Sequence, residues 1–91
     1  MKQIAIVTGA SRGIGRGIAT ELAGTHQVIA TYKGRRDAAE SLRAESGVEI
    51  IQCDIGNSAD REKLIDFARE RFGRLDLLVN NAGVAPRTRR D

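Results

Sequence analysis

The sequence contains few of the residues that build disulfide-rich, metal-binding or membrane proteins. Its 91 residues include one cysteine, one proline, one histidine and no tryptophan, and aromatic residues make up 3%. The single cysteine, Cys53, excludes an internal disulfide, provides no metal cluster and is typical of a reducing cytoplasm. No apolar run approaches the roughly 20 residues that a membrane helix needs. Residues 1–4 lead directly into a strand-like segment, so we expect no signal peptide, no membrane association and a cytoplasmic location.

Because aromatic side chains are scarce, the core must come from aliphatic residues, and these occur in alternating strand and helix patterns. Short apolar runs predict strands over residues 3–8, 27–31, 48–53 and 75–79. Apolar spacing, caps and terminal glycines predict helices over residues 13–23, from Asp37 to just before Gly47, and from a capping Ser58 to Phe72. Gly24 would end the first of these helices. This alternation predicts a parallel sheet with right-handed crossovers, in an α/β fold.

The clearest functional motif lies between the first strand and the first helix, where the chain reads Thr8-Gly9-Ala10-Ser11-Arg12-Gly13-Ile14-Gly15. Glycines let the backbone approach a pyrophosphate closely, and a helix N-terminus offers free N–H groups and the positive end of its dipole. A glycine in the first helical turn also lets the helix lie close to the sheet. A glycine-rich turn without a ligand is the alternative, and the strand–turn–helix context favours the dinucleotide site.

Three motifs together resemble the short-chain dehydrogenase/reductase family, and the stretch from Asn80 to Asp91 resembles most its 3-oxoacyl-(acyl-carrier-protein) reductase-like members. They are the glycine turn, then Cys53-Asp54-Ile55 after the third strand, then Asn80-Asn81-Ala82-Gly83 after the fourth. The resemblance covers essentially the whole chain. It implies a Rossmann-like, doubly wound parallel sheet truncated to about four strands, in the order 3-2-1-4, with three helices.

The resemblance also implies which residues bind a nicotinamide dinucleotide. The phosphate turn would be formed by Gly9, Gly13 and Gly15, lined by Ser11 and Arg12, with a backbone N–H from Ile14. Asp54 would accept a hydrogen bond from the adenine amino group and Ile55 would border the adenine. Asn81, Ala82 and Gly83 would run past the ribose region, and Asn80 would brace the sheet. From composition alone, Asp54 is a turn residue before Gly56, and residues 80–83 are a strand-terminating turn.

The end of the second strand indicates which cofactor is preferred. NAD-selective sites place an acid there to bind the ribose 2′-hydroxyl. This chain instead has Lys33, Arg35 and Arg36, and no acid before Asp37. Cations bind the extra phosphate of NADP through charge-assisted hydrogen bonds, and Arg12 could close on the same phosphate. We therefore expect NADP(H), with NAD less favoured; a solvated basic loop is the alternative.

Family members carry a Tyr-x-x-x-Lys pair and a serine in the second half of the fold, and the tyrosine acts as general acid/base. The only tyrosine here, Tyr32, is followed four residues later by Arg36 and lies on the adenosine side. We expect no catalytic residue in this chain, no metal site, and no turnover by the chain alone.

We interpret residues 1–91 as the N-terminal half of an NAD(P)-binding domain, with residues 83–91 as a tail or the start of an incomplete helix. Its parent activity would be hydride transfer between NADPH and a carbonyl or alcohol, such as a 3-oxoacyl thioester. The alternatives are a stand-alone nucleotide-binding or oligomerisation module and an inert truncated fragment. We expect the fourth strand to be a bare apolar edge that invites self-association or a C-terminal half. The basic residues 87–90 lack interleaved aromatics, so we expect no nucleic-acid binding.

Overall fold

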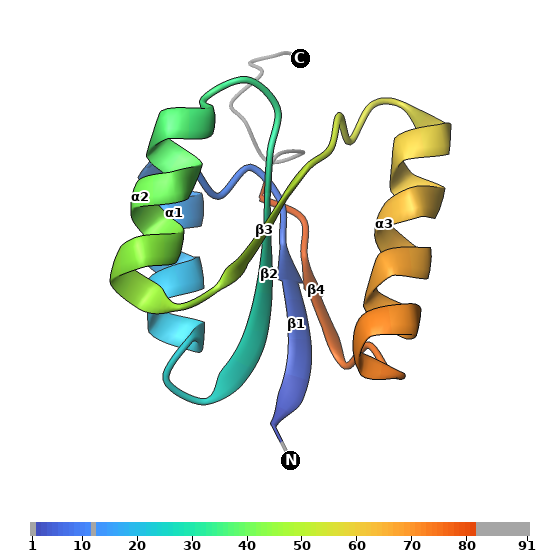
Figure 1. Cartoon of the computed structure of the whole chain (residues 1–91), viewed down its shortest axis with the longest axis horizontal. Coiled ribbons are helices and arrows are strands. Elements are labelled where there is room, and N and C mark those ends of the chain that lie inside the picture. Colours follow the sequence, from blue (N-terminus) through green and yellow to red (C-terminus); the bar gives the residue numbers. More distant parts are fainter. Residues whose placement is uncertain (1, 12, 82–91) are drawn as a thin grey trace, which may run out of the picture.

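The expected alternation of strands and helices is present in the computed structural model, which describes residues 2–11 and 13–81 (Figure 1). The elements are, in chain order, β1 (Gln3–Val7), α1 (Gly13–Leu22), β2 (His26–Tyr32), α2 (Arg36–Ser46), β3 (Glu49–Gln52), α3 (Ser58–Phe72) and β4 (Leu77–Val79). The predicted tail over residues 83–91 lies outside the described residues.

All four strands are parallel, and their order is β3-β2-β1-β4, which confirms the predicted topology. In the register, Ala5 of β1 is opposite Val28 of β2 on one side and Leu77 of β4 on the other. Helices α1 and α2 cover one face of the sheet and α3 covers the other (Figure 1). Because the strands are parallel, the carboxyl ends of β1, β2 and β3 meet at one edge of the sheet, beside the turns that follow them.

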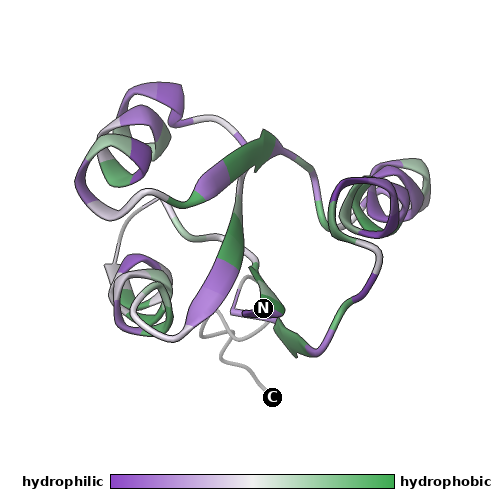
Figure 2. Cartoon of the chain, turned by 60° about the horizontal axis from the view of Figure 1, so that its bottom comes forward, coloured by the Kyte–Doolittle hydropathy of each residue, from purple (hydrophilic) through white to green (hydrophobic). Residues whose placement is uncertain are grey.

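The two faces of β1 carry side chains of different size, because successive residues of a strand point to opposite faces. Ala5 and Val7 pack with Ala19 in the layer beneath α1 and α2, whereas Ile4 and Ile6 pack with residues of α3. Ala5 and Ala19 are completely buried. Small side chains on the α1 side let that helix approach the sheet closely. Figure 2 shows strands that are largely hydrophobic, with hydrophilic stretches, between helices that carry both hydrophobic and hydrophilic residues.

Glycines end two of the helices as predicted and α1 begins at Gly13 as predicted, but the N-cap residues of α2 and α3 differ from the predictions. Gly47 and Gly73 have φ of 74° and 80° and close α2 and α3 in the left-handed conformation, whereas Gly24 has no positive φ. Asn57, not Ser58, is the N-cap of α3, because its side chain accepts a hydrogen bond from Asp60 N.

The capping box predicted at the start of α2 is absent. Arg35 is the N-cap residue and makes no side-chain capping bond. The carboxylate of Glu40 instead pairs with two arginines of its own helix, Arg36 at 3.5 Å and Arg43 at 2.7 Å. Ion pairs three and four residues apart along the helix have replaced the expected backbone cap.

Among the described residues, β4 is the edge strand of the sheet, as predicted from the strand order. This strand begins at Leu77 rather than at residue 75, because Asp76 departs from strand pairing: its carboxylate accepts from Ile4 N at 2.8 Å while its own N–H donates to Ile4 O. Leu77 and Leu78 are 38% and 52% exposed. The fourth strand is thus a short edge with apolar side chains in contact with solvent. No helix in residues 2–11 and 13–81 is both long and apolar enough to cross a membrane.

Candidate functional site

The turn from β1 into α1, which we call the glycine loop (residues 8–15), contains backbone conformations that residues other than glycine rarely adopt. Gly9 and Gly13 have φ of 61° and 67°, in the region that favours glycine. Gly15 is needed for a different reason. A Cβ on Gly15 would lie 2.3 Å from Gly9 O and 2.6 Å from Asn81 Nδ2. The loop and the first turn of α1 therefore pack against each other backbone to backbone.

Neighbouring strands anchor the glycine loop from both sides. From β2, Thr31 Oγ1 accepts from Gly9 N at 3.2 Å and Thr31 O accepts from Ala10 N at 2.9 Å. From the end of β4, Asn81 Nδ2 donates to Gly9 O at 3.2 Å, and Asn80 Oδ1 lies 3.2 Å from the Thr8 hydroxyl. Asn80 and Asn81 therefore connect the end of β4 to the loop, consistent with the bracing role predicted for Asn80.

Thr31 is a site residue that the sequence analysis missed. It is 1% exposed and is one of the few polar side chains within the core. A buried hydroxyl needs a partner, and the Gly9 amide supplies it. The available signal was a polar residue at the end of the apolar run that predicted the second strand.

A cleft of about 370 Å³ opens at the carboxyl ends of β1, β2 and β3. Its walls are formed by Gly9, Thr31, Lys33, Cys53, Asp54, Ile55 and Gly56. The cleft brings together four of the predicted site residues, Gly9, Lys33, Asp54 and Ile55, from three separate turns. Its position beside the glycine loop is where ligands bind in open α/β sheets.

Asp54 has contacts that fit both interpretations of it. Its Oδ1 accepts from Gly56 N at 3.0 Å, as a turn residue would, and its Oδ2 lies 3.8 Å from Lys33 Nζ across the cleft. The Asp54 backbone is held by Asp60, whose carboxylate accepts from Asp54 N at 2.9 Å. A carboxylate has about four acceptor positions, so one turn bond leaves capacity for an amine donor in the cleft.

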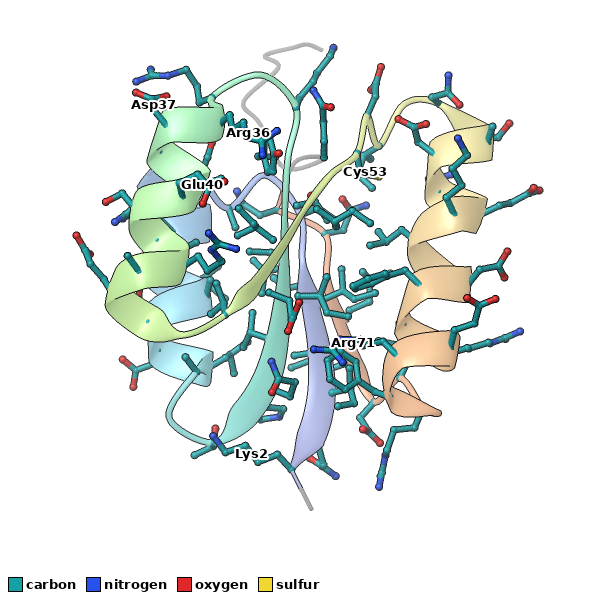
Figure 3. All side chains as sticks on the ribbon, viewed as in Figure 1. Lys2, Arg36, Asp37, Glu40, Cys53 and Arg71 are labelled. Carbon is teal, nitrogen blue, oxygen red and sulfur yellow. The ribbon has the colours of Figure 1, made fainter. Side chains whose placement is uncertain are left out.

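The three predicted phosphate-binding cations have different surroundings. Lys33 lines the cleft, and its side chain is 77% exposed. Arg35 pairs with Asp37 at 3.4 Å, and hydrogen bonding to Arg35 lowers the pKa of that carboxyl. Arg36 lies beside Glu40 at the start of α2 (Figure 3). Lys33 is thus the one of these three cations on the cleft wall.

The remaining predicted residues lie at the start of α1 or outside the described residues. Ile14 is 77% exposed and lines an apolar groove of about 440 Å³ with Ile18, Leu22 and Leu77. Ser11 contributes its backbone carbonyl, which accepts from Arg16. Structure is not described for Arg12, Ala82 and Gly83, so their predicted roles lie outside the described residues.

The environment of Cys53 makes it a core residue rather than a nucleophile. Cys53 is 5% exposed, and its thiol donates to Asp60 O at 3.6 Å. Burial, followed by the charges of Asp60 and Asp54, raises the pKa of the Cys53 thiol, which keeps it protonated near neutral pH. His26 begins β2 and therefore lies at the opposite end of the sheet from the cleft.

The family assignment follows from comparison with known proteins. A model of the short chain dehydrogenase family matches residues 3–91. The chain belongs to the short-chain dehydrogenase family. This confirms the resemblance drawn from the glycine turn and the motifs after the third and fourth strands, and the observed strand order confirms the fold that it implied.

Its relatives in the short-chain dehydrogenase family include two bacterial reductases. A 3-oxoacyl-(acyl-carrier-protein) reductase of Buchnera aphidicola is 40% identical over 88 residues, covering 91% of this chain and 35% of the relative. An acetoacetyl-CoA reductase of Shinella zoogloeoides is 39% identical over 85 residues, covering 92% and 35%. Menthone neomenthol reductase of Mentha piperita superimposes with a TM-score of 0.79 at 36% identity, covering 89% of this chain and 31% of that structure. The chain thus spans about a third of the length of these proteins.

Proposed function

We propose that this chain is the cofactor-binding portion of an NADP(H)-dependent short-chain oxidoreductase. The observation that carries the proposal is the cleft beside the glycine loop, which collects Gly9, Lys33, Asp54 and Ile55 at the carboxyl ends of the strands. The activity of the whole enzyme would be hydride transfer between NADPH and a carbonyl or alcohol. The names of its reductase relatives suggest a 3-oxoacyl thioester as the substrate. When bound, the nicotinamide ring supplies or accepts the hydride.

In the proposed assignment, different parts of the cofactor lie against different turns at the carboxyl edge of the sheet. The pyrophosphate would lie against Gly9, Gly13 and the first turn of α1, where side chains would obstruct it and the helix N-terminus attracts anions. The adenine would lie against Ile55, with its amino group donating to the Asp54 carboxylate. Ser11, Arg12, Ile14, Gly15, Asn81, Ala82 and Gly83 keep the roles that the family resemblance implies. These roles are proposals.

The preference for NADP over NAD rests on charge at the end of β2. The sequence has no acid there, and Lys33 lines the cleft. Arg35 and Arg36 are held by ion pairs whose arginine side chains are 54% and 76% exposed. Exposed pairs of this kind contribute only about 0–1 kcal/mol, so a phosphate dianion can compete for either guanidinium.

Cofactor titration tests the proposal. We expect the NADPH fluorescence to change on addition of the protein, at lower concentration than the NADH fluorescence does. Lys33→Gln should weaken NADPH binding by roughly 10-fold, because a charge-assisted hydrogen bond is lost, and leave NADH binding unchanged. Lys63→Gln removes a lysine from the exposed surface of α3 and serves as the matched control.

Three results would count against parts of the proposal. If neither dinucleotide binds at millimolar concentration, the chain is an inert fragment. If both bind equally, the NADP preference is wrong. If Lys63→Gln weakens NADPH binding as much as Lys33→Gln, the effect is one of net charge and not of the cleft. An intact enzyme would also require catalytic groups that we do not assign to any described residue.

The exposed edge of β4 supports a second proposal, that the 91-residue chain associates through this strand. Leu77 and Leu78 are exposed on a strand that pairs on one side only within residues 2–11 and 13–81, and apolar grooves flank it beside α1 and α3. Such an edge can pair with a second copy or with a polypeptide that supplies the following strands. A stand-alone nucleotide-binding or oligomerisation module would use the same edge. The cytoplasmic location and the absence of nucleic-acid binding stay predictions.

Sedimentation velocity over a range of concentrations tests this association. The parent chain should form dimers or larger species, and Leu78→Lys should shift it to monomer because a charge cannot be buried at the new contact. Ala44→Lys, on the exposed surface of α2, adds the same single charge away from β4 and serves as the control. A parent chain that stays monomeric at high concentration would refute the association and leave the cofactor proposal untouched.

A further inference from the structure

Arg16 makes more contacts between separate elements than the neighbouring helix residues, and the sequence analysis did not single it out. It lies on α1, one residue beyond Gly15, and its side chain is 25% exposed. Nη1 donates to Ser11 O at 3.4 Å and to Ala38 O at 2.9 Å. Nη2 donates to Ser41 Oγ at 3.3 Å and pairs with Glu45 Oε1 at 2.9 Å.

These four acceptors belong to two segments on either side of the proposed cofactor. Ser11 is in the glycine loop, beside the pyrophosphate position. Ala38 is in the first turn of α2, directly after the basic residues that end β2. The guanidinium is planar and its donors have fixed directions, so one arginine holds both backbone carbonyls in a defined relation.

The contact to Glu45 extends the same connection along α2. The Ser41 hydroxyl donates to Glu45 Oε2 at 3.3 Å, so the carboxylate is held by Ser41 and Arg16 together. The Glu45 side chain is 67% exposed, and an exposed ion pair of this kind is weak. The carbonyl bonds therefore provide most of the positional constraint, and Glu45 orients the guanidinium.

We propose that Arg16 is a positioning residue that fixes the glycine loop against the first turn of α2 and thereby sets selectivity for a 2′-phosphorylated dinucleotide. The inference rests on the proposed function, because the pyrophosphate and the 2′-phosphate would occupy the two segments that Arg16 joins. Arg16 is absent from the residues that line the cleft in the described part of the chain, so it acts through the spacing of other groups. Without Arg16, the distance between the pyrophosphate and the basic residues Lys33, Arg35 and Arg36 is no longer fixed.

The test compares two readouts in Arg16→Met and Arg16→Lys. In Arg16→Met the Kd for NADPH should rise roughly 10-fold and that for NADH less than about 2-fold, because charge-assisted bonds to two carbonyls are lost. Arg16→Lys can reach one carbonyl but not both, and should give an intermediate ratio. Hydrogen exchange of the ligand-free protein should increase in the glycine loop and the first turn of α2, and stay unchanged in α3.

Arg71→Met is the matched control. Arg71 of α3 also pairs with an acid on another element, Glu49 at 3.0 Å, but it lies on the opposite face of the sheet (Figure 3). This variant should leave the NADPH to NADH ratio unchanged.

The outcomes separate this inference from the proposed function. If the parent chain binds neither dinucleotide, the proposed function and the selectivity role fall together, and exchange alone decides whether Arg16 joins the two segments. If the parent binds but Arg16→Met weakens NADPH and NADH equally, or leaves exchange unchanged, the inference about Arg16 is wrong and the proposed function stands.

Discussion

Replacement of Gly15 by alanine perturbs the closest backbone contact in the proposed site. The added Cβ would lie 2.3 Å from Gly9 O and 2.6 Å from Asn81 Nδ2, well inside van der Waals contact. Asn81 can rotate, but the Gly9 carbonyl is backbone. It cannot move without shifting the glycine loop, whose amides are bonded to Thr31. The loop and α1 must therefore separate.

The expected change in the free energy of unfolding combines two destabilising contributions and one stabilising contribution. Overpacking of this kind costs about 1–3 kcal/mol. Loss of the Asn81 hydrogen bond to Gly9 O costs about 1 kcal/mol more. Alanine is the better helix former and returns up to about 1 kcal/mol. The net expectation for Gly15→Ala is a loss of about 1–3 kcal/mol in the free energy of unfolding.

Urea denaturation followed by circular dichroism measures this change, and Gly17→Ala provides the matched control. Gly17 lies on the same helix, and apart from its chain neighbours and the nearby backbone of α1, no atom of the described residues comes within 4 Å of an added Cβ there. Gly17→Ala should therefore raise the stability by about 0.5–1 kcal/mol through helix propensity alone. The two variants should shift the urea midpoint in opposite directions, and Gly15→Ala should also weaken NADPH binding.

Because Gly15→Ala and Gly17→Ala are expected to change the stability in opposite directions, two results would refute the reasoning. If Gly15→Ala is as stable as the parent or more stable, the loop can yield at no cost and the close approach is not a constraint. If both variants destabilise equally, the cause is a property of α1 and not the contact with Gly9.

Three further predictions concern a cap, a carboxylate and the thiol. Asn57→Ala should lower the free energy of unfolding by about 1 kcal/mol, because the N-cap of α3 is lost, whereas Ser58→Ala should change it little. Asp76→Asn should lower the free energy of unfolding near pH 7. Hydrogen bonding to Arg74 lowers the pKa of Asp76 in the folded state, so the difference in this free energy between variant and parent should narrow as the pH falls below about 4. Cys53 should react with Ellman's reagent much more slowly in the folded protein than in urea, because burial raises the pKa of its thiol.

Each of these has an outcome that contradicts it. If Asn57→Ala and Ser58→Ala lower the free energy of unfolding equally, Ser58 also caps α3. A difference between Asp76→Asn and the parent that widens on acidification would reverse the sign expected for a lowered pKa. Equal rates for Cys53 with and without urea would place the thiol at the surface.

The sequence by itself determined the order and type of the elements. Apolar runs and helical spacing are local properties, and so are the glycines that end helices; Gly47 and Gly73 take the left-handed conformation that their positions predicted. The sequence also indicated a turn after β1 that needs glycine, and the positive φ of Gly9 and Gly13 agrees with it, whereas the pyrophosphate contact stays a prediction. The family resemblance rested on the same short motifs, and the match over residues 3–91 confirms it.

The tertiary structure decided which of several similar residues makes a given contact. Asn57 and Ser58 are both good capping residues, and the cap fell to Asn57 in a turn where Asp60 holds the Asp54 amide. Of three cations near the end of β2, Lys33 lines the cleft and pairs with Asp54 across it, while Arg35 and Arg36 pair with acids of α2.

The contacts that build the site join residues far apart in the chain. Thr31 meets Gly9 across 22 residues, Arg16 meets Ala38 across 22, and Asn81 meets Gly9 across 72. Periodicity reports neighbours within one or two turns of a helix or along one strand. It carries no information on which hydroxyl or guanidinium a parallel crossover brings to a given amide. Only the packing of α1 and α2 on one face, with β4 beside β1, brought these partners together.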